Sequence, residues 1–172
     1  MQDVLMIDCL LNNQLGGSNV FSEWERDARG SGGFESGRYP PASLQALLRT
    51  FLVKDVALEV KHSVVIYVLM DLANVLDSDQ YGSALQNFMQ FPAAFGMTVG
   101  KMRLIQAFWH LDHQAFDTAL DMLLDPLISV RDTDPWQHRC IIRILTLQGQ
   151  ARMALRYVRS RRPPLQQQGD IR

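Results

Sequence analysis

The sequence lacks the long hydrophobic runs and the cysteine pairs that mark membrane-spanning or disulfide-stapled proteins. Its longest unbroken apolar run covers residues 64–70, well short of the roughly 18 residues that a membrane-spanning helix needs. The first residues have no basic stretch followed by an apolar core, so we expect neither a signal peptide nor a membrane span. Cys9 and Cys140 both lie among apolar residues at helical spacing. We therefore expect buried thiols in a reducing intracellular compartment.

Residues at catalytic or metal-binding spacing are also scarce. His110, Asp112 and His113 form the densest group of potential ligands, but a metal site needs three or four that converge. Their Asp-His order is the reverse of the His-Asp pair in all-helical phosphohydrolases. The aspartates of residues 77–79 and 132–134 lack the glycine and the final glutamate of a calcium loop. We predict no enzyme activity, no catalytic residue, no metal, no cofactor and no small-molecule substrate.

What the sequence does contain is a helical phrase that occurs twice. The phrases AFDTALDML and QARMALRYV each follow an apolar helical stretch and a polar turn. Ala119-Leu120 of the first phrase recurs 35 residues later as Ala154-Leu155. A period of roughly 34–47 residues with two helices per unit is typical of an α-solenoid. The sequence therefore predicts an all-α fold, an α-solenoid-like stack of antiparallel helix pairs.

The spacing of apolar and turn-forming residues predicts four regions. They are an N-terminal helix (1–15), a flexible Gly/Ser-rich loop (16–38), an α-helical domain (39–160) and a disordered basic, Gln-rich tail (161–172). Within the domain, helices are expected over residues 56–76, 98–111, 114–124, 134–149 and 150–160, with shorter ones near 40–52 and 84–89.

Two features bear on individual helices. The β-branched residues 64–70 alone could form a buried strand, but the 3.6-residue spacing of their flanks and the lack of a second strand candidate favour a helix. Asp134, followed by Pro135 and by Gln137 at the third helical position, predicts a capping box that begins the helix there.

Charge is distributed unevenly along the chain. Residues 1–138 hold 9 Lys/Arg and 17 Asp/Glu, a balance of −8, whereas residues 139–172 hold 8 Arg and one Asp, a balance of +7. Such asymmetry predicts an electrostatically polarised interaction surface.

The arginines of the last predicted helix and its end are the candidate partner contacts. They are Arg152, Arg156, Arg159, Arg161 and Arg162. The first three recur at i, i+4 and i+7, so they share one helix face. This face could bind phosphates or an acidic partner, or it could be a solvated face whose cations favour the helix C-terminus. No aromatic platform accompanies the arginines, so sequence-specific DNA reading is not expected.

Several phrases, taken in order, resemble the helical domain of the ELYS family of nuclear pore assembly proteins. The block from Lys101 to His113 is the best match. The other phrases are Tyr39-Pro40-Pro41, residues 61–72, Phe91-Pro92, residues 120–126, Trp136-Gln137-His138 and residues 148–157. Residues 16–38 and 77–90 depart from the family pattern.

The resemblance implies functions beyond those that the residues indicate alone. Proteins of this family join the Y-shaped nucleoporin subcomplex and seed pore assembly on chromatin after mitosis. They reside in the nucleus, at the nuclear pores of the envelope, and in animals also at kinetochores. The resemblance therefore implies a scaffold segment whose partners are Y-subcomplex proteins, with chromatin reached only through parts absent from this chain. It also implies that the chain is a segment of a larger protein or a shortened member.

A generic helical-repeat adaptor of another intracellular complex is the alternative reading, because it shares the architecture and differs only in partner. An enzyme would instead show a deep pocket with convergent titratable groups. A solenoid segment should expose apolar patches at its ends, where the next repeat would pack.

Overall fold

A computed structural model of the chain describes residues 5–14, 39, 43, 45, 48, 49, 52, 56–76, 96–129 and 131–164. The predicted loop 16–38, the predicted helix at 84–89, most of the predicted helix at 40–52 and tail residues 165–172 lie outside these ranges. The chain divides into two compact units, residues 1–97 and 98–172. The predicted domain of residues 39–160 is therefore described in two parts.

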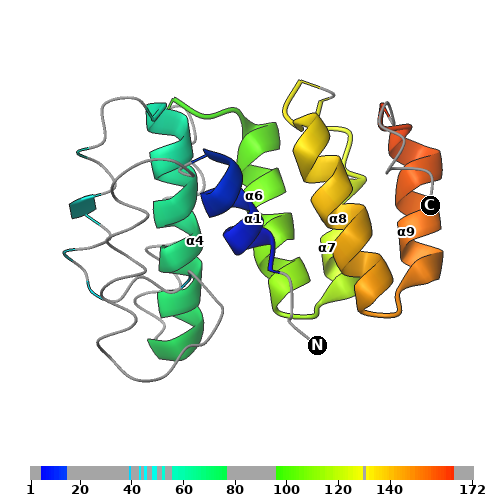
Figure 1. The fold of residues 1–172 in the computed structure, drawn as a ribbon, viewed down its shortest axis with the longest axis horizontal. Helices are drawn as coiled ribbons and strands as arrows, with labels where there is room; N and C mark the ends of the chain where they lie inside the picture. The colour runs from blue at the N-terminus through cyan, green and yellow to red at the C-terminus, as the bar shows by residue number, and fades with distance from the viewer. Residues whose placement is uncertain are drawn as a thin grey trace. The chain divides into compact units, whose positions relative to one another are not determined.

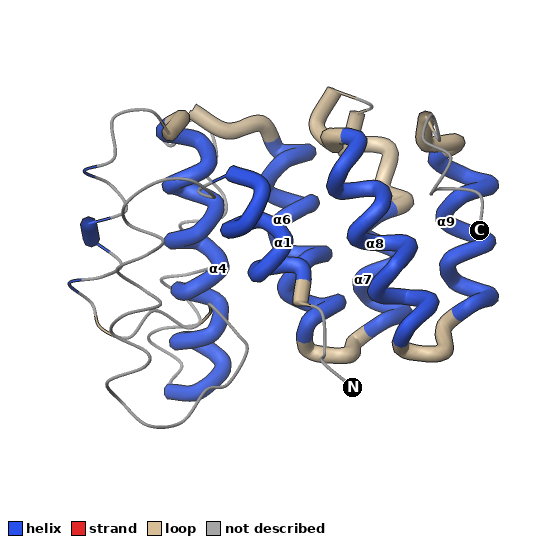
Figure 2. Tube along the Cα trace, in the orientation of Figure 1, coloured by secondary structure: helices blue, strands red, loops and turns tan. Residues whose placement is uncertain are grey.

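The described residues form helices and connecting turns, with no strand among them, which confirms the all-α prediction (Figures 1 and 2). The first unit contains α1 (Met6–Gln14) and α4 (Leu58–Leu76). The second contains α6 (Val99–Asp112), α7 (Phe116–Leu123), α8 (Pro135–Leu147) and α9 (Ala151–Arg161). Residues 64–70 are helical within α4, as predicted.

In the first unit, α1 packs against α4, and Tyr39 contacts both helices. The backbone N–H of Tyr39 donates to Asp8 Oδ1 of α1 at 3.2 Å, and its hydroxyl donates to the Asp71 carboxylate of α4. The Tyr39 ring also meets Tyr67 of α4 edge to face, with 5.2 Å between centroids. This geometry is favourable for aromatic pairs.

The second unit consists of two helical hairpins, α6–α7 and α8–α9 (Figure 1). Both turns close in the same way. Gln114 and Gly149, 35 residues apart, have left-handed backbones with φ of 60° and 74°. The next N–H in each, from Ala115 and from Gln150, donates to a carbonyl five residues back, at 2.9 and 2.7 Å. The repeat seen in the sequence is thus a repeat of helix–turn–helix geometry. Two hairpins do not by themselves make a solenoid.

The helix starts also follow the sequence. Thr98 caps α6, because its hydroxyl accepts the Lys101 N–H at 3.1 Å. At α8 the Asp134 N–H donates to Gln137 Oε1 at 2.7 Å, which is the predicted capping-box contact. The α8–α9 turn begins after Leu147, two residues before the predicted end of that helix at Gly149.

The core of the second unit is formed by the inward sides of its four helices. Ala119 and Ala154, the small residues of the repeated phrase, are both buried, which lets the helices approach closely. The buried apolar residues are Met102, Leu104, Ile105, Ala107, Phe108, Leu111, Ala119, Leu120, Leu123, Ile128, Ile141, Ile144, Leu145, Ala154 and Tyr157.

The two equivalent turns give a matched pair of stability predictions. A Cβ at Gly149 would meet no atom within 4 Å, so Gly149→Ala should cost only the left-handed backbone penalty, about 1–2 kcal/mol. Gln114→Gly should remove the same kind of penalty and stabilise the chain by up to about 1 kcal/mol. Urea unfolding followed by circular dichroism measures both. Shifts of the same sign for the two variants would contradict this account of the turns.

Candidate interaction surface

Three of the five predicted contact arginines lie together on the exposed side of α9. Arg152, Arg156 and Arg159 are all exposed, whereas Ala154 and Tyr157 on the opposite side of the helix are buried. The i, i+4, i+7 spacing thus places three cations on one face, as the sequence indicates.

Leu155 lies in the same row and is 56% exposed. Leu155 is not among the predicted contact residues, although its spacing from Arg152 and Arg159 places it on the same face. The α9 outer face is therefore defined by Arg152, Leu155, Arg156 and Arg159. It combines cationic heads with an exposed aliphatic side chain.

Arg161, another of the predicted contact residues, lies apart from the α9 outer face. Its guanidinium donates to three backbone carbonyls, Leu123 O at 2.6 Å, Ile128 O at 2.7 Å and Asp125 O at 2.7 Å. The side chain is half-buried and turned toward the end of α7. The Leu123 carbonyl is one of the last of α7, which have no partner within the helix, and the Asp125 and Ile128 carbonyls lie in the connection that follows.

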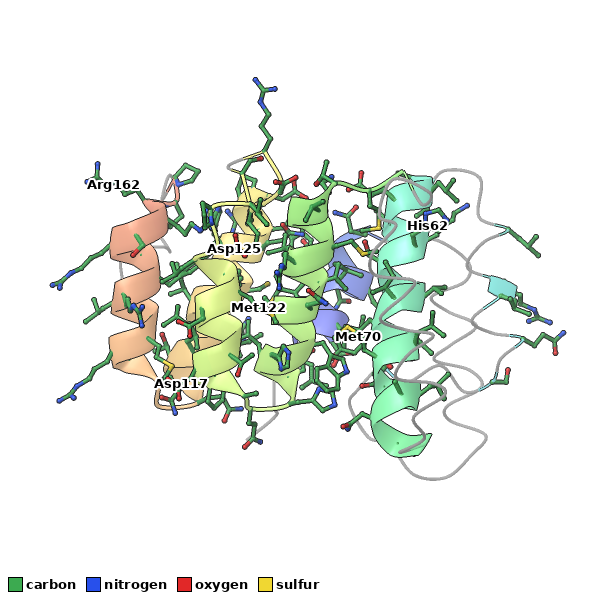
Figure 3. All side chains as sticks on the ribbon, turned by 180° about the vertical axis from the view of Figure 1, so that it is seen from behind. His62, Met70, Asp117, Met122, Asp125 and Arg162 are labelled. Carbon is green, nitrogen blue, oxygen red and sulfur yellow. The ribbon has the colours of Figure 1, made fainter. Side chains whose placement is uncertain are left out.

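Helix α9 extends into the region predicted as a tail. Arg161 is the last residue of α9, Arg162 caps the helix with a left-handed backbone (φ 46°), and Pro163 is buried. Helix α9 thus includes Arg161, and the structure describes residues 162–164 of the predicted tail 161–172. Figure 3 shows Arg162 at the C-terminal end of α9, and its side chain is exposed.

A buried polar pair fixes α9 against α8. His138 Nδ1 lies 2.6 Å from the Tyr157 hydroxyl, and both residues are buried. Burial lowers the pKa of His138, with the Arg161 cation acting in the same direction and Asp134 opposing it. Burial likewise raises the pKa of the Tyr157 hydroxyl. Both groups are therefore neutral near pH 7, as a buried hydrogen-bonded pair requires.

The connection between α7 and α8 is anchored by one carboxylate. Asp132 accepts the Thr98 hydroxyl at 2.8 Å and the Ser129 N–H at 2.7 Å. Burial raises the pKa of Asp132, but these hydrogen bonds and the nearby Lys101 outweigh it and lower the pKa overall. A Cβ on Gly100 would lie 2.4 Å from Asp132 Oδ2, so only glycine fits beneath this carboxylate.

The residues considered as metal ligands are arranged differently. His113 stacks on Trp109 with 3.9 Å between ring centroids, and its Nδ1 lies 2.8 Å from the Trp109 carbonyl oxygen. His110 meets the edge of the same indole ring. Within the described ranges, no three His, Cys, Asp or Glu side chains are grouped so that they could hold a metal ion. Cys9 and Cys140, predicted to be buried, are half-buried.

The charges of α7 and α9 are opposite at equivalent positions of the repeat. Asp117 and Asp121 of α7 occupy the places that Arg152 and Arg156 occupy on α9. Asp121 and Arg156 form an ion pair of 3.9 Å, and both side chains are largely exposed. Figure 3 shows Asp117 at the N-terminal end of α7.

These observations define the class of protein first. It is an all-helical protein with repeated helix–turn–helix hairpins and a basic, partly apolar face on its last described helix. None of the described helices is long and apolar enough to cross a membrane.

Comparison with known proteins then gives the family. A family model described as "ELYS: Nuclear pore complex assembly" matches residues 4–172. The chain is 36% identical to human Protein ELYS over 169 residues, which is 98% of this chain and 7% of that protein. It is also 36% identical to Protein ELYS of Xenopus laevis over 159 residues, 92% of this chain and 6% of that protein. The chain belongs to the ELYS family, and it spans less than a tenth of the length of these relatives.

The carbonyl contacts of Arg161 generate a stability prediction. Arg161→Lys keeps the charge but cannot reproduce the planar fork of donors. We expect a loss of roughly 2 kcal/mol, since a hydrogen bond to a charged group contributes about 1.5–3 kcal/mol. Arg159→Lys on the exposed side should change stability by less than about 0.5 kcal/mol. Urea unfolding gives the totals and hydrogen exchange of α9 amides localises the loss. Equal effects of the two substitutions would refute the role given to Arg161.

The His138–Tyr157 pair generates a pH prediction. The folded-state pKa of His138 lies below its ordinary value of 6.5. Between the two values the unfolded chain binds more protons, so acidification from pH 7.5 to 5.5 should destabilise the fold. His138→Gln should reduce this pH dependence, whereas His113→Gln, at an exposed site where it acts only on the pKa of His110, should change it less. Urea midpoints across the pH range measure both. An unchanged slope in His138→Gln would show that other groups govern the acid response.

Proposed function

We propose that this chain is a structural scaffold segment of a nuclear pore assembly protein. It docks onto the Y-shaped nucleoporin subcomplex and supports pore assembly at chromatin after mitosis. The observation that carries the proposal is the match of nearly the whole chain to ELYS proteins at 36% identity. Its place is the nuclear pore complex of the nuclear envelope, and kinetochores in mitosis. Contact with chromatin belongs to parts outside this chain.

The architecture supports a scaffold role. Hairpins that repeat at 35 residues and close with the same turn geometry are the building blocks of an α-solenoid. Such stacks present extended surfaces to proteins. We propose that the two hairpins of the second unit belong to a solenoid of this kind, and that the chain acts by binding and not by catalysis.

The proposal is tested with an affinity pull-down. The tagged chain is incubated with nuclear extract, and captured proteins are identified by mass spectrometry. Recovery of Y-subcomplex nucleoporins is expected. Recovery of a different complex would refute the pore-scaffold function and favour a helical-repeat adaptor.

Two double charge-reversal variants test whether the α9 outer face makes this contact. Arg152→Glu with Arg156→Glu should reduce recovery of these nucleoporins at least tenfold, because two of the three exposed cations of the α9 outer face are inverted. Arg131→Glu with Arg143→Glu makes the same change in net charge at exposed sites outside α9 and should leave recovery near wild type. Equal losses in the two variants would mean that net charge, and not the α9 outer face, controls binding.

A further inference from the structure

Equivalent leucines of the two hairpins have very different exposure. Leu120 of α7 is 2% exposed, whereas Leu155, its equivalent on α9, is 56% exposed. The next apolar position shows the same trend, because Leu123 is buried and its equivalent Val158 is only half-buried. One side of the repeated helix is thus covered in α7 and open in α9.

The packing of the second unit explains what covers that side of α7. Helix α9 packs against α7, and Arg161 of α9 donates to the Leu123 carbonyl at 2.6 Å. In this contact the second helix of one hairpin therefore packs on the second helix of the other. On α9 the residues equivalent to Leu120 and Leu123 are Leu155 and Val158. More than half of the Leu155 side chain is exposed to solvent. An occupant that repeats the geometry of the α7–α9 contact is a helix.

Charge specifies what kind of helix would fit. Helix α7 carries Asp117 and Asp121, and Arg156 of α9 reaches Asp121 at 3.9 Å. On the open face the three arginines Arg152, Arg156 and Arg159 are all exposed. Asp121 pairs with Arg156 from the α7 side, and the sequence has no acidic residue between Asp134 and Asp170 that could pair with Arg152 or Arg159 from within α9 or its flanks. The open face is therefore cationic around an aliphatic centre.

We propose that the α9 outer face is a docking site for an acidic amphipathic helix of a protein partner. The partner helix packs an aliphatic side chain on Leu155 and Val158 and directs carboxylates to Arg152, Arg156 and Arg159. From Arg152 to Arg159 the helix rises about 10.5 Å, two turns. Carboxylates at i, i+4 and i+7 of a second helix have the same rise. The inference rests on the proposed function in taking the chain to be a protein-binding scaffold.

A phosphate ligand would use this surface less completely. Phosphate groups pair with guanidinium groups but would leave Leu155 in water. The face also lacks an aromatic side chain on which a nucleic-acid base could stack, because Tyr157 is buried on the other side of α9. The exposed leucine within the arginine row is the observation that favours a protein helix.

The experiment selects ligands for the full chain from a displayed library of 18-residue helical peptides. Alternating rounds use the Arg152→Glu/Arg156→Glu protein for counter-selection. We expect enriched peptides with Asp or Glu at i and i+4 beside an aliphatic residue. Their affinity should fall at least tenfold for Arg152→Glu/Arg156→Glu and at least threefold for Leu155→Ser. The matched control Arg131→Glu/Arg143→Glu should bind as wild type. Peptides with Lys in place of the acidic residues should regain binding to the charge-reversed protein.

Each other result overturns the proposal. Failure to enrich peptides, enrichment without acidic bias, or affinity unchanged by Leu155→Ser would do so. Tight binding of inositol hexakisphosphate or of a single-stranded oligonucleotide that depends on the arginines but not on Leu155 would assign the face to phosphates. Concentration-dependent self-association lost in Leu155→Ser would assign it to a second copy.

The two proposals can fail separately. The wild-type pull-down tests the nuclear pore function whichever surface is used, whereas peptide selection tests the α9 outer face whichever complex the chain joins. Recovery of Y-subcomplex proteins without peptide enrichment would leave the function and discard the site. Circular dichroism of every variant confirms that it is folded, which the exposure of the substituted side chains leads us to expect.

Discussion

The second unit depends on one cation placed against the end of a helix. Helix α7 finishes with carbonyl groups that have no partner inside the helix. The Arg161 guanidinium supplies three donors to the Leu123, Asp125 and Ile128 carbonyls, each within 2.7 Å. Its charge also matches the negative end of the helix dipole. Because Arg161 is the last residue of α9, this contact fixes the end of α9 and with it the direction of the α9 outer face.

Two side chains of opposite charge hold the connection between α7 and α8. They are the Asp132 carboxylate and the Arg161 guanidinium. The Asp132 carboxylate accepts from the Thr98 side chain at the start of α6, the positive end of that helix, while Arg161 donates to the Leu123 carbonyl at the negative end of α7. Gly100 leaves the space for the first of these contacts, since any Cβ there would lie 2.4 Å from Asp132 Oδ2. A connection without helical structure is therefore held in place by side chains whose charges suit the helix termini they meet.

Local sequence signals predicted the helices well. They did not predict the roles of Arg161 and Leu155, which depend on tertiary contacts. The capping box at Asp134 and the 35-residue repeat depend on neighbours in sequence, so they were readable, and the equivalence of Gln114 and Gly149 follows from the same repeat. The role of Arg161 was not readable, because its carbonyl partners lie 33–38 residues away. The sequence therefore did not distinguish Arg161, which stabilises the fold, from the other arginines of α9. Leu155 was missed for the opposite reason, since an apolar residue in a repeated phrase suggests core.

The arginines of α9 differ in how much they contribute to folding stability, as well as in position. The Asp121–Arg156 pair spans 3.9 Å between exposed side chains, and pairs of this kind contribute between zero and about 1 kcal/mol. The fold therefore gains little from the cations of the α9 outer face, whereas it gains several hydrogen bonds from Arg161. Folding stability then accounts for Ala154, Tyr157 and Arg161 but not for three arginines around an exposed leucine. Because contacts within the described fold do not explain that combination, it is the observation on which the proposed binding role of the α9 outer face rests.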